Sequence, residues 1–344
     1  MAILYIIQHL LSVLILFKLK KLYAFISLFF FIIIFTFKPD TFDMHMYPLI
    51  VDQTHNYEFL FGKLIDFLSL LIKDNRQVIL AYQIFMLILS SLILLFFLDS
   101  ENKILILAII FSSVAMMLGV NNNLRQGTAS ILILLGMLSY IFGYKKTGFF
   151  FILSSQGFHE SAIFFVIVVI FSSFIYSNLY KLLILNSKFT NMLPFYLLAI
   201  LLAFATVFML SGSIYILDLI TLETSRFKNY YRFFQYSDFR TSLMNKTLLI
   251  LLLIVITEFI LKFRLINYKL DLFRFLRIYF LLFCLFLSFV SNFSEIGNRI
   301  LYFYYVIEIG VLCFLVSQKY FNTLTVNLLA YAFAFNVINI LGGI

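Results

Sequence analysis

The sequence contains little charge. Only 12% of its 344 residues are Asp, Glu, Lys or Arg, while 63% are hydrophobic. Soluble globular proteins carry roughly 25% charged residues. A soluble fold of this length would therefore leave too much apolar surface in water. The scarcity of charge excludes an ordinary soluble domain and predicts a protein that is embedded in lipid.

Cysteine is scarce and tryptophan is absent. The two cysteines, Cys284 and Cys313, lie in separate apolar runs, and we expect both to be small buried side chains. No Cys/His spacing typical of a metal site occurs. We therefore predict no cofactor, although the acidic pair Asp40 and Asp43 leaves a divalent metal open. Without tryptophan, tyrosine is expected to supply the aromatic belts at the membrane interfaces.

Long apolar runs, separated by polar breaks, make up most of the chain. Most are roughly 16–21 residues long, near the length with which a helix crosses ~30 Å of hydrocarbon. They predict an all-α, polytopic membrane helix bundle of about twelve transmembrane helices, forming one domain over residues 1–344. The expected spans are 2–17, 22–37, 78–98, 103–120, 126–142, 147–157, 160–177, 193–212, 247–261, 275–290, 299–316 and 324–342. The run 147–157 is short, which predicts a broken or half-crossing helix that continues into 160–177.

Two longer polar segments, 38–77 and 213–246, separate some of these runs. Both have helical texture and mix apolar with charged residues. In 59–73, for example, Lys63, Asp66 and Lys73 are surrounded by apolar side chains. We expect these segments to carry interfacial or re-entrant helices.

Lysine and arginine predict the orientation. If Lys18–Lys21 lie in the cytoplasm, the other short cytoplasmic loops are also basic, and most acidic residues fall on the opposite, outer face. The net charge of +9 is then mainly anchoring charge, and no nucleic-acid partner is expected. The outer loops are also the more varied in residue type, which predicts a functional site that opens away from the cytoplasm.

Two of the outer polar patches lie early in the chain. The segment PDTFDMHMY, residues 39–47, contains Asp40 and Asp43, which on a helix would share a face with Tyr47. These acids could bind a metal, act as a base, or simply be solvated. In NNNLRQG, residues 121–127, the planar fork of Arg125 suits phosphate. A snorkelling interfacial arginine is the alternative, but the neighbouring amides favour a polar cavity that includes Asn123 and Gln126.

Three further patches contain the remaining candidates. In SSQGFHESA, residues 154–162, His159 could act as a base, bind a sugar hydroxyl, or be a satisfied interfacial histidine. In 222–240, the mixture of basic and aromatic side chains is suited to binding phosphate and sugar rings. A helix on the membrane surface is the alternative. In 291–305, Arg299 lies four residues after Glu295. Arg299 could bind the substrate, or it could form a structural ion pair with Glu295. The binding candidates in the last two patches are Arg226, Tyr230, Arg232, Arg299 and Tyr302.

Four of these motifs, taken in order, resemble the EpsG/Wzy-type polysaccharide polymerases, the O-antigen and exopolysaccharide polymerase group of bacterial inner membranes. They are PDTFDMHMY with Glu58 after it, then NNNLRQG, FHESA and NRILYFYY. The spacing of LRQG and FHESA, about thirty residues apart, is the most specific part of the resemblance. The motifs cover most of the chain. The resemblance implies a GT-C-like helix bundle.

The resemblance also implies an enzyme of lipopolysaccharide or exopolysaccharide biosynthesis with a periplasmic active site. Its substrate would be an undecaprenyl-diphosphate-linked oligosaccharide in the membrane lipid, with a chain-length regulator open as a further partner. The growing glycan would move from its diphosphate carrier to a hydroxyl of a new lipid-linked repeat unit. Arg125 and Arg299, with Arg226 or Arg232, would stabilise the diphosphate. Asp40, Asp43 or His159 would be the base.

Two other functions stay open. A membrane glycosyltransferase that adds single sugars from a polyprenyl-phosphate donor would also carry acids in its first outer loop. A flippase or transporter of lipid-linked sugars should line its path with polar groups through the membrane depth. Few ionisable residues are expected there, Glu308 being the clearest, so transport is disfavoured.

Overall fold

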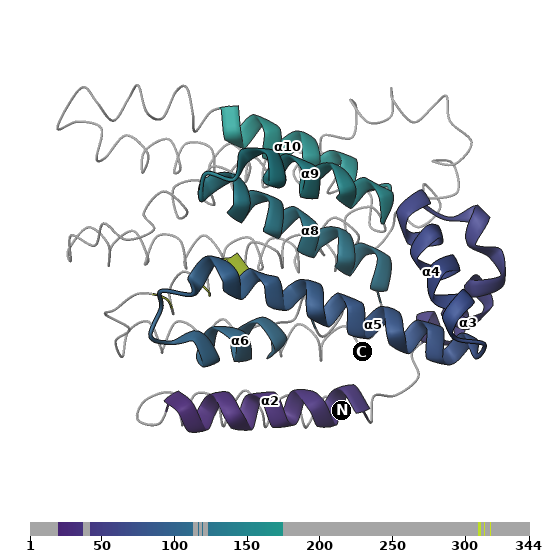
Figure 1. Cartoon of the computed structure of the whole chain (residues 1–344), viewed down its shortest axis with the longest axis horizontal. Helices are drawn as coiled ribbons and strands as arrows, with labels where there is room; N and C mark the ends of the chain where they lie inside the picture. The colour runs from purple at the N-terminus through teal and green to yellow at the C-terminus, as the bar shows by residue number, and fades with distance from the viewer. Residues whose placement is uncertain are drawn as a thin grey trace, which may run out of the picture. The chain divides into compact units, whose positions relative to one another are not determined.

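Figure 1 shows the computed structural model of the chain. The structure describes residues 20–36, 42–112, 116, 119, 123–174, 309, 310, 313 and 317. Every regular element within these residues is a helix. Contacts divide the chain into two units: residues 1–163 with 305–344, and residues 164–304. The described part of the second unit is residues 164–174, which belong to one helix.

The helices follow the expected apolar runs closely where both are known. In chain order they are α2 (Lys20–Thr36), α3 (Phe42–Ile50), η1 (Val51–Asn56), α4 (Phe59–Leu71), α5 (Asn75–Ser91), η2 (Leu92–Phe97), α6 (Lys103–Ser112), α8 (Leu124–Ile141), α9 (Lys145–Ser154), η3 (Ser155–Gly157) and α10 (Ala162–Phe174). The predicted runs 22–37, 78–98 and 126–142 correspond to α2, to α5 with η2, and to α8. The predicted runs 2–17, 193–212, 247–261, 275–290 and 324–342 lie outside the described residues.

Two helices are long and apolar enough to cross a membrane among the residues that the structure describes. They are Asn75–Phe97, which joins α5 to η2, and Leu124–Ile141, which is α8. The first has exposed Leu80, Ile84 and Ile88 along one side, spaced by four residues. Such an apolar stripe is unfavourable in water and suits contact with lipid chains.

Helix α8 is the core of the first unit. Fifteen of its 18 residues are buried, and it contacts α5, η2, α9 and η3. The hydroxyls of Thr128 and Ser130 donate to carbonyls of their own helix, at Leu124 and Gln126. The Tyr82 hydroxyl of α5 bonds Thr128 Oγ1 at 2.8 Å. The buried hydroxyls of Thr128 and Ser130 are thus satisfied, as a buried position requires.

Two glycines let α9 pack directly on α8. A Cβ on Gly136 would come within 2.8 Å of the Gly148 carbonyl oxygen, and a Cβ on Gly148 within 2.7 Å of the Gly136 carbonyl oxygen. Small residues at a crossing allow this close backbone approach in membrane helix pairs. Helix α9 is only ten residues long. The prediction of a short, broken helix over 147–157 is confirmed, and η3 and the turn 158–161 separate it from α10.

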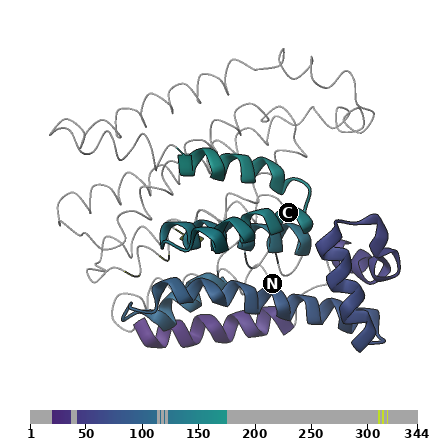
Figure 2. The ribbon, with the colours of Figure 1, turned by 45° about the horizontal axis from the view of Figure 1, so that its top comes forward.

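Helices α3 and α4 form a separate layer at one end of the first unit, where α5 and α8 begin; Figures 1 and 2 show the same placement from two directions. The start of α5 holds this layer in place. Asp74 caps α5 by accepting from the backbone N–H of Arg76 at 2.8 Å. The next side chain, Asn75, donates to the carbonyl of Pro48 in α3. The polar segment 38–77 therefore contains helices. That these helices are interfacial or re-entrant stays a prediction, and the segment 213–246 lies outside the described residues.

Cys313 is buried, as expected from its apolar neighbours in the sequence. Cys284 lies outside the described residues.

Replacing Gly148 with Leu should separate α8 from α9. The new Cβ would also meet the Tyr140 backbone nitrogen at 2.9 Å, and backbone cannot move aside as a flexible side chain can. Overpacking of this kind costs about 1–3 kcal/mol, so the thermal unfolding temperature of the detergent-purified protein should fall. Thr147→Ala, at the exposed neighbouring position, is the control; equal unfolding temperatures for the two variants would contradict the packing described.

Candidate functional site

An ion pair joins the α3–α4 layer to the buried helix α8. Arg125, in the first turn of α8, places Nη1 at 2.7 Å from Glu58 Oε2. Glu58 precedes α4 at its N-cap position, but its side chain makes no capping hydrogen bond. The carboxylate is turned to Arg125 instead, and is only 10% exposed. Charge-assisted hydrogen bonds of this length are among the strongest in proteins.

Two aromatic rings also contact the same guanidinium. The Cζ atom of Arg125 lies 4.9 Å from the centroid of Tyr57 and 5.8 Å from that of Phe61. Phe61 in turn packs edge-on against Tyr82, with centroids 5.3 Å apart. Cation–π contacts at these distances are favourable. Arg125 is therefore held by the rings as well as by its carboxylate partner.

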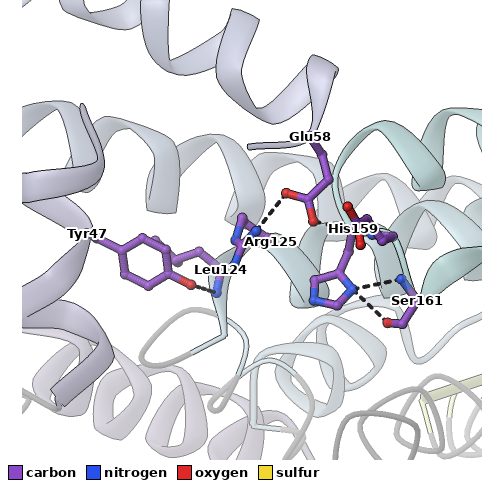
Figure 3. A network of polar contacts seen from close by, with 7 residues as sticks. Tyr47, Glu58, Leu124, Arg125, His159 and Ser161 are labelled. Atoms are coloured by element: carbon purple, nitrogen blue, oxygen red, sulfur yellow. Dashed lines mark hydrogen bonds and ion pairs between the residues drawn. The ribbon is translucent and has the colours of Figure 1, made fainter. Parts of the chain in front are cut away.

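The turn between η3 and α10 also contacts the Glu58 carboxylate. The backbone N–H of Glu160 donates to Glu58 Oε1 at 3.3 Å. Gly157 lies against Leu60 of α4, so closely that a Cβ at this glycine would overlap the leucine side chain. Glu58 thus bridges the first turn of α8 and the turn 158–161, as Figure 3 shows.

His159 is buried within this turn and bonded through Nδ1. The backbone N–H of Ser161 donates to Nδ1 at 3.2 Å, and Ser161 Oγ lies 2.6 Å from the same atom. A ring nitrogen that accepts from a backbone N–H carries no proton, so this network assigns the proton of the neutral ring to Nε2. In this tautomer Nε2–H is a hydrogen-bond donor.

Tyr47 fixes the start of α8. Its buried hydroxyl accepts from the backbone N–H of Leu124 at 3.1 Å. This N–H belongs to the first turn, where a helix has no internal acceptor for it. The tyrosine therefore satisfies a buried donor and ties α3 to the residue before Arg125.

The structure brings together three of the five patches predicted from the sequence: Tyr47 from 39–47, Arg125 from 121–127 and His159 from 154–162. Asn123 precedes α8 at its N-cap without a side-chain capping bond, and Gln126 is buried in its first turn. Asp43 lies in α3, four residues before Tyr47, but its side chain is outside the described part. Asp40, Arg226, Tyr230, Arg232, Glu295, Arg299, Tyr302 and Glu308 also lie outside the described residues, so their predicted roles stay predictions.

Glu58, Tyr57 and Phe61 are the residues of this cluster that the sequence did not single out as site residues. There was one indication for Glu58 in the sequence: it follows the Asp-rich patch among the motifs that carry the family resemblance. Its pairing with Arg125 spans 67 residues, and no local spacing predicts so distant a contact.

The cluster is suited to binding an anion. Arg125 Nη1 and the Glu160 N–H converge on one carboxylate, and both are donors that a phosphate oxygen can use equally well. Arg125 Nε is buried, and no described residue accepts a hydrogen bond from it. Within the described residues, no group of three or more His, Cys, Asp or Glu side chains could hold a metal.

Residues 21–342 match the model of the EpsG family, which is nearly the whole chain. The chain belongs to the EpsG family. This confirms the resemblance inferred from the motifs, and EpsG-family proteins are membrane proteins, in agreement with the two long apolar helices. Membership also suggests a polymerase-type function in polysaccharide biosynthesis. Neither the curated proteins nor the solved structures give a match.

Replacing Arg125 with Ala should destabilise the protein, because it leaves the nearly buried Glu58 carboxylate without its counter-charge. The expected cost is about 2–3 kcal/mol in the free energy of unfolding. The double variant Arg125→Ala with Glu58→Gln should recover part of this loss, since no charge is then left unpaired. Thermal unfolding of the single and double variants measures the coupling. Additive effects would show that the ion pair does not form.

Replacing Tyr47 with Phe should cost about 1–2 kcal/mol, because the buried Leu124 N–H loses its acceptor while the ring stays. Tyr144→Phe, at an exposed tyrosine, should leave the unfolding temperature unchanged. If both variants unfold alike, Tyr47 does not support the start of α8.

Proposed function

We propose that the chain is a polysaccharide polymerase of the bacterial inner membrane. It transfers an undecaprenyl-diphosphate-linked glycan chain onto a new lipid-linked repeat unit at the periplasmic face. The main support for the proposal is Arg125, which lies at the start of a buried helix and contacts both Glu58 and the ring of Tyr57. The chain that contains this site belongs to the EpsG family over residues 21–342.

Breaking the bond between a sugar and a diphosphate leaves negative charge on the departing group. Fixed cationic donors stabilise such charge strongly where water is excluded. Arg125 supplies a planar fork of N–H donors on a rigid helix, which suits phosphate oxygens. Arg299, with Arg226 or Arg232, is the further cation that we propose for the second phosphate, and Asn123, Gln126, Tyr230 and Tyr302 complete the sugar and phosphate contacts.

The acceptor hydroxyl must lose a proton as the new glycosidic bond forms. Asp40, Asp43 and His159 are the proposed candidates for this base. The tautomer of His159 favours a role other than that of the base, because its Nδ1 lone pair already accepts a hydrogen bond from Ser161. A neutral histidine that donates through Nε2 can bind a phosphate or hydroxyl oxygen, which leaves proton removal to one of the aspartates.

Deletion of the gene in its native host tests the reaction. A gel of the surface polysaccharide should lose its ladder of chain lengths and retain a single repeat unit. A strain that loses the repeat unit itself would contradict the proposal, because an earlier step would then be missing.

The variants Arg125→Ala and Arg299→Ala should each lower the amount of polymer about a hundredfold or more, with the protein still inserted in the membrane. Lys63→Ala is the control, since Lys63 is exposed on α4 and pairs only at 3.6 Å with Asp66. Normal chain lengths in both arginine variants would show that the site assignment is wrong. Cysteine-accessibility labelling that placed residues 125 and 299 on opposite faces of the membrane would do the same.

A further inference from the structure

We propose that Glu58 occupies, in the free protein, the seat that one phosphate of the substrate takes, and that binding displaces it. This inference rests on the proposed function, because it names the first event at the same site. The seat consists of Arg125 Nη1 and the backbone N–H of Glu160, which both converge on the Glu58 carboxylate.

The hydrogen bonds of the Glu58 carboxylate are ones that a phosphate group could replace. Arginine and carboxylate bind most strongly as a bidentate pair, with two parallel N–H···O bonds. Here one carboxylate oxygen meets Nη1 at 2.7 Å, while the other turns away to the Glu160 N–H at the long distance of 3.3 Å. The buried Nε of Arg125 has no acceptor among the described residues. A diphosphate, with more oxygens and more charge, can satisfy donors that this carboxylate leaves unused.

The arginine is placed so that it can remain where it is when Glu58 leaves. Tyr57 and Phe61 hold its guanidinium through their ring faces, and neither contact involves the carboxylate. Tyr47 fixes the backbone one residue earlier, at Leu124. Displacement of Glu58 therefore need not disorder the cation that receives the substrate.

Glu58 is also the part of the cluster that can move most readily. It stands just before α4, in an extended backbone conformation, and its side chain takes no part in capping that helix. Turning the side chain away breaks the two contacts with the seat and leaves the hydrogen bond of its own carbonyl to Gly62 in place. The resident carboxylate keeps the buried arginine paired until a stronger anion arrives.

The test is calorimetric titration of the full-length, detergent-purified chain with farnesyl diphosphate, a soluble isoprenoid diphosphate. Glu58→Gln removes the competing charge and keeps the side-chain shape, so it should bind the probe about tenfold more tightly than the wild type, a difference of about 1.4 kcal/mol. Asp66→Asn is the matched control: it removes one acidic charge from α4 without touching Arg125, and its affinity should equal that of the wild type. Farnesol, which lacks the anion, should bind all variants alike.

Three outcomes separate the possibilities. Tighter binding by Glu58→Gln together with loss of binding in Arg125→Ala supports displacement. Equal or weaker binding by Glu58→Gln, with loss in Arg125→Ala, overturns displacement but keeps Arg125 as the diphosphate site. Unchanged binding in Arg125→Ala overturns both this inference and the diphosphate site of the proposed function.

Hydrogen exchange of the wild-type protein gives a second measurement that needs no variant. Only the side chain of Glu58 is displaced, so the backbone N–H of Gly62 should keep its protection in peptides covering residues 57–62 when farnesyl diphosphate is added. Peptides covering 158–161 should gain protection, because the Glu160 N–H exchanges its long bond to Glu58 for a bond to a phosphate oxygen. Unchanged or lower protection over 158–161 on binding would overturn the displacement.

Discussion

The contact between Arg125 and Glu58 is the constraint on which the site depends. A guanidinium at the start of a buried, apolar helix is costly unless a counter-charge or a polar cavity accompanies it. Glu58 supplies that charge from another layer, 67 residues earlier in the chain. The pairing requires the turn before α4 to lie over the first turn of α8, and the Glu160 N–H extends the same requirement to the turn before α10.

Several packing contacts hold the α3–α4 layer in this position. Asn75 ties the start of α5 to α3, and Tyr47 ties α3 to the backbone of Leu124. Gly157 allows Leu60 to approach the turn after α9 closely. Each contact joins a residue of the α3–α4 layer to the end of the helices below it. Because these contacts are independent of the ion pair, the layer can stay in position while the charges at its centre are exchanged for those of a ligand.

The sequence predicted the helices well and the contacts between them poorly. A run of apolar residues is a local property, and so the extents of α2, α5 and α8 could be read within a few residues. The short α9 also followed from the length of its run. The Arg125 site was predicted from residue chemistry, since arginine next to amides at a membrane boundary is unfavourable without a polar partner. Which acid serves as that partner was not predictable, because Asp40, Asp43, Glu58 and Glu160 all occur in polar segments of the sequence and only the packing of the α3–α4 layer selects Glu58.

The selection of Glu58 changes how the acids near the site should be interpreted. The Glu58 carboxylate is engaged by Arg125 and by the Glu160 N–H, so it lies where an anion can be bound. Glu58 therefore suits the binding step, in which it holds the place of an anion, better than it suits proton removal. A base for the acceptor hydroxyl has the opposite requirement, since it must be free of a permanent cation. Glu58 is therefore not the acid that we propose as the base, and Asp40 and Asp43 are the first residues to replace in a search for it.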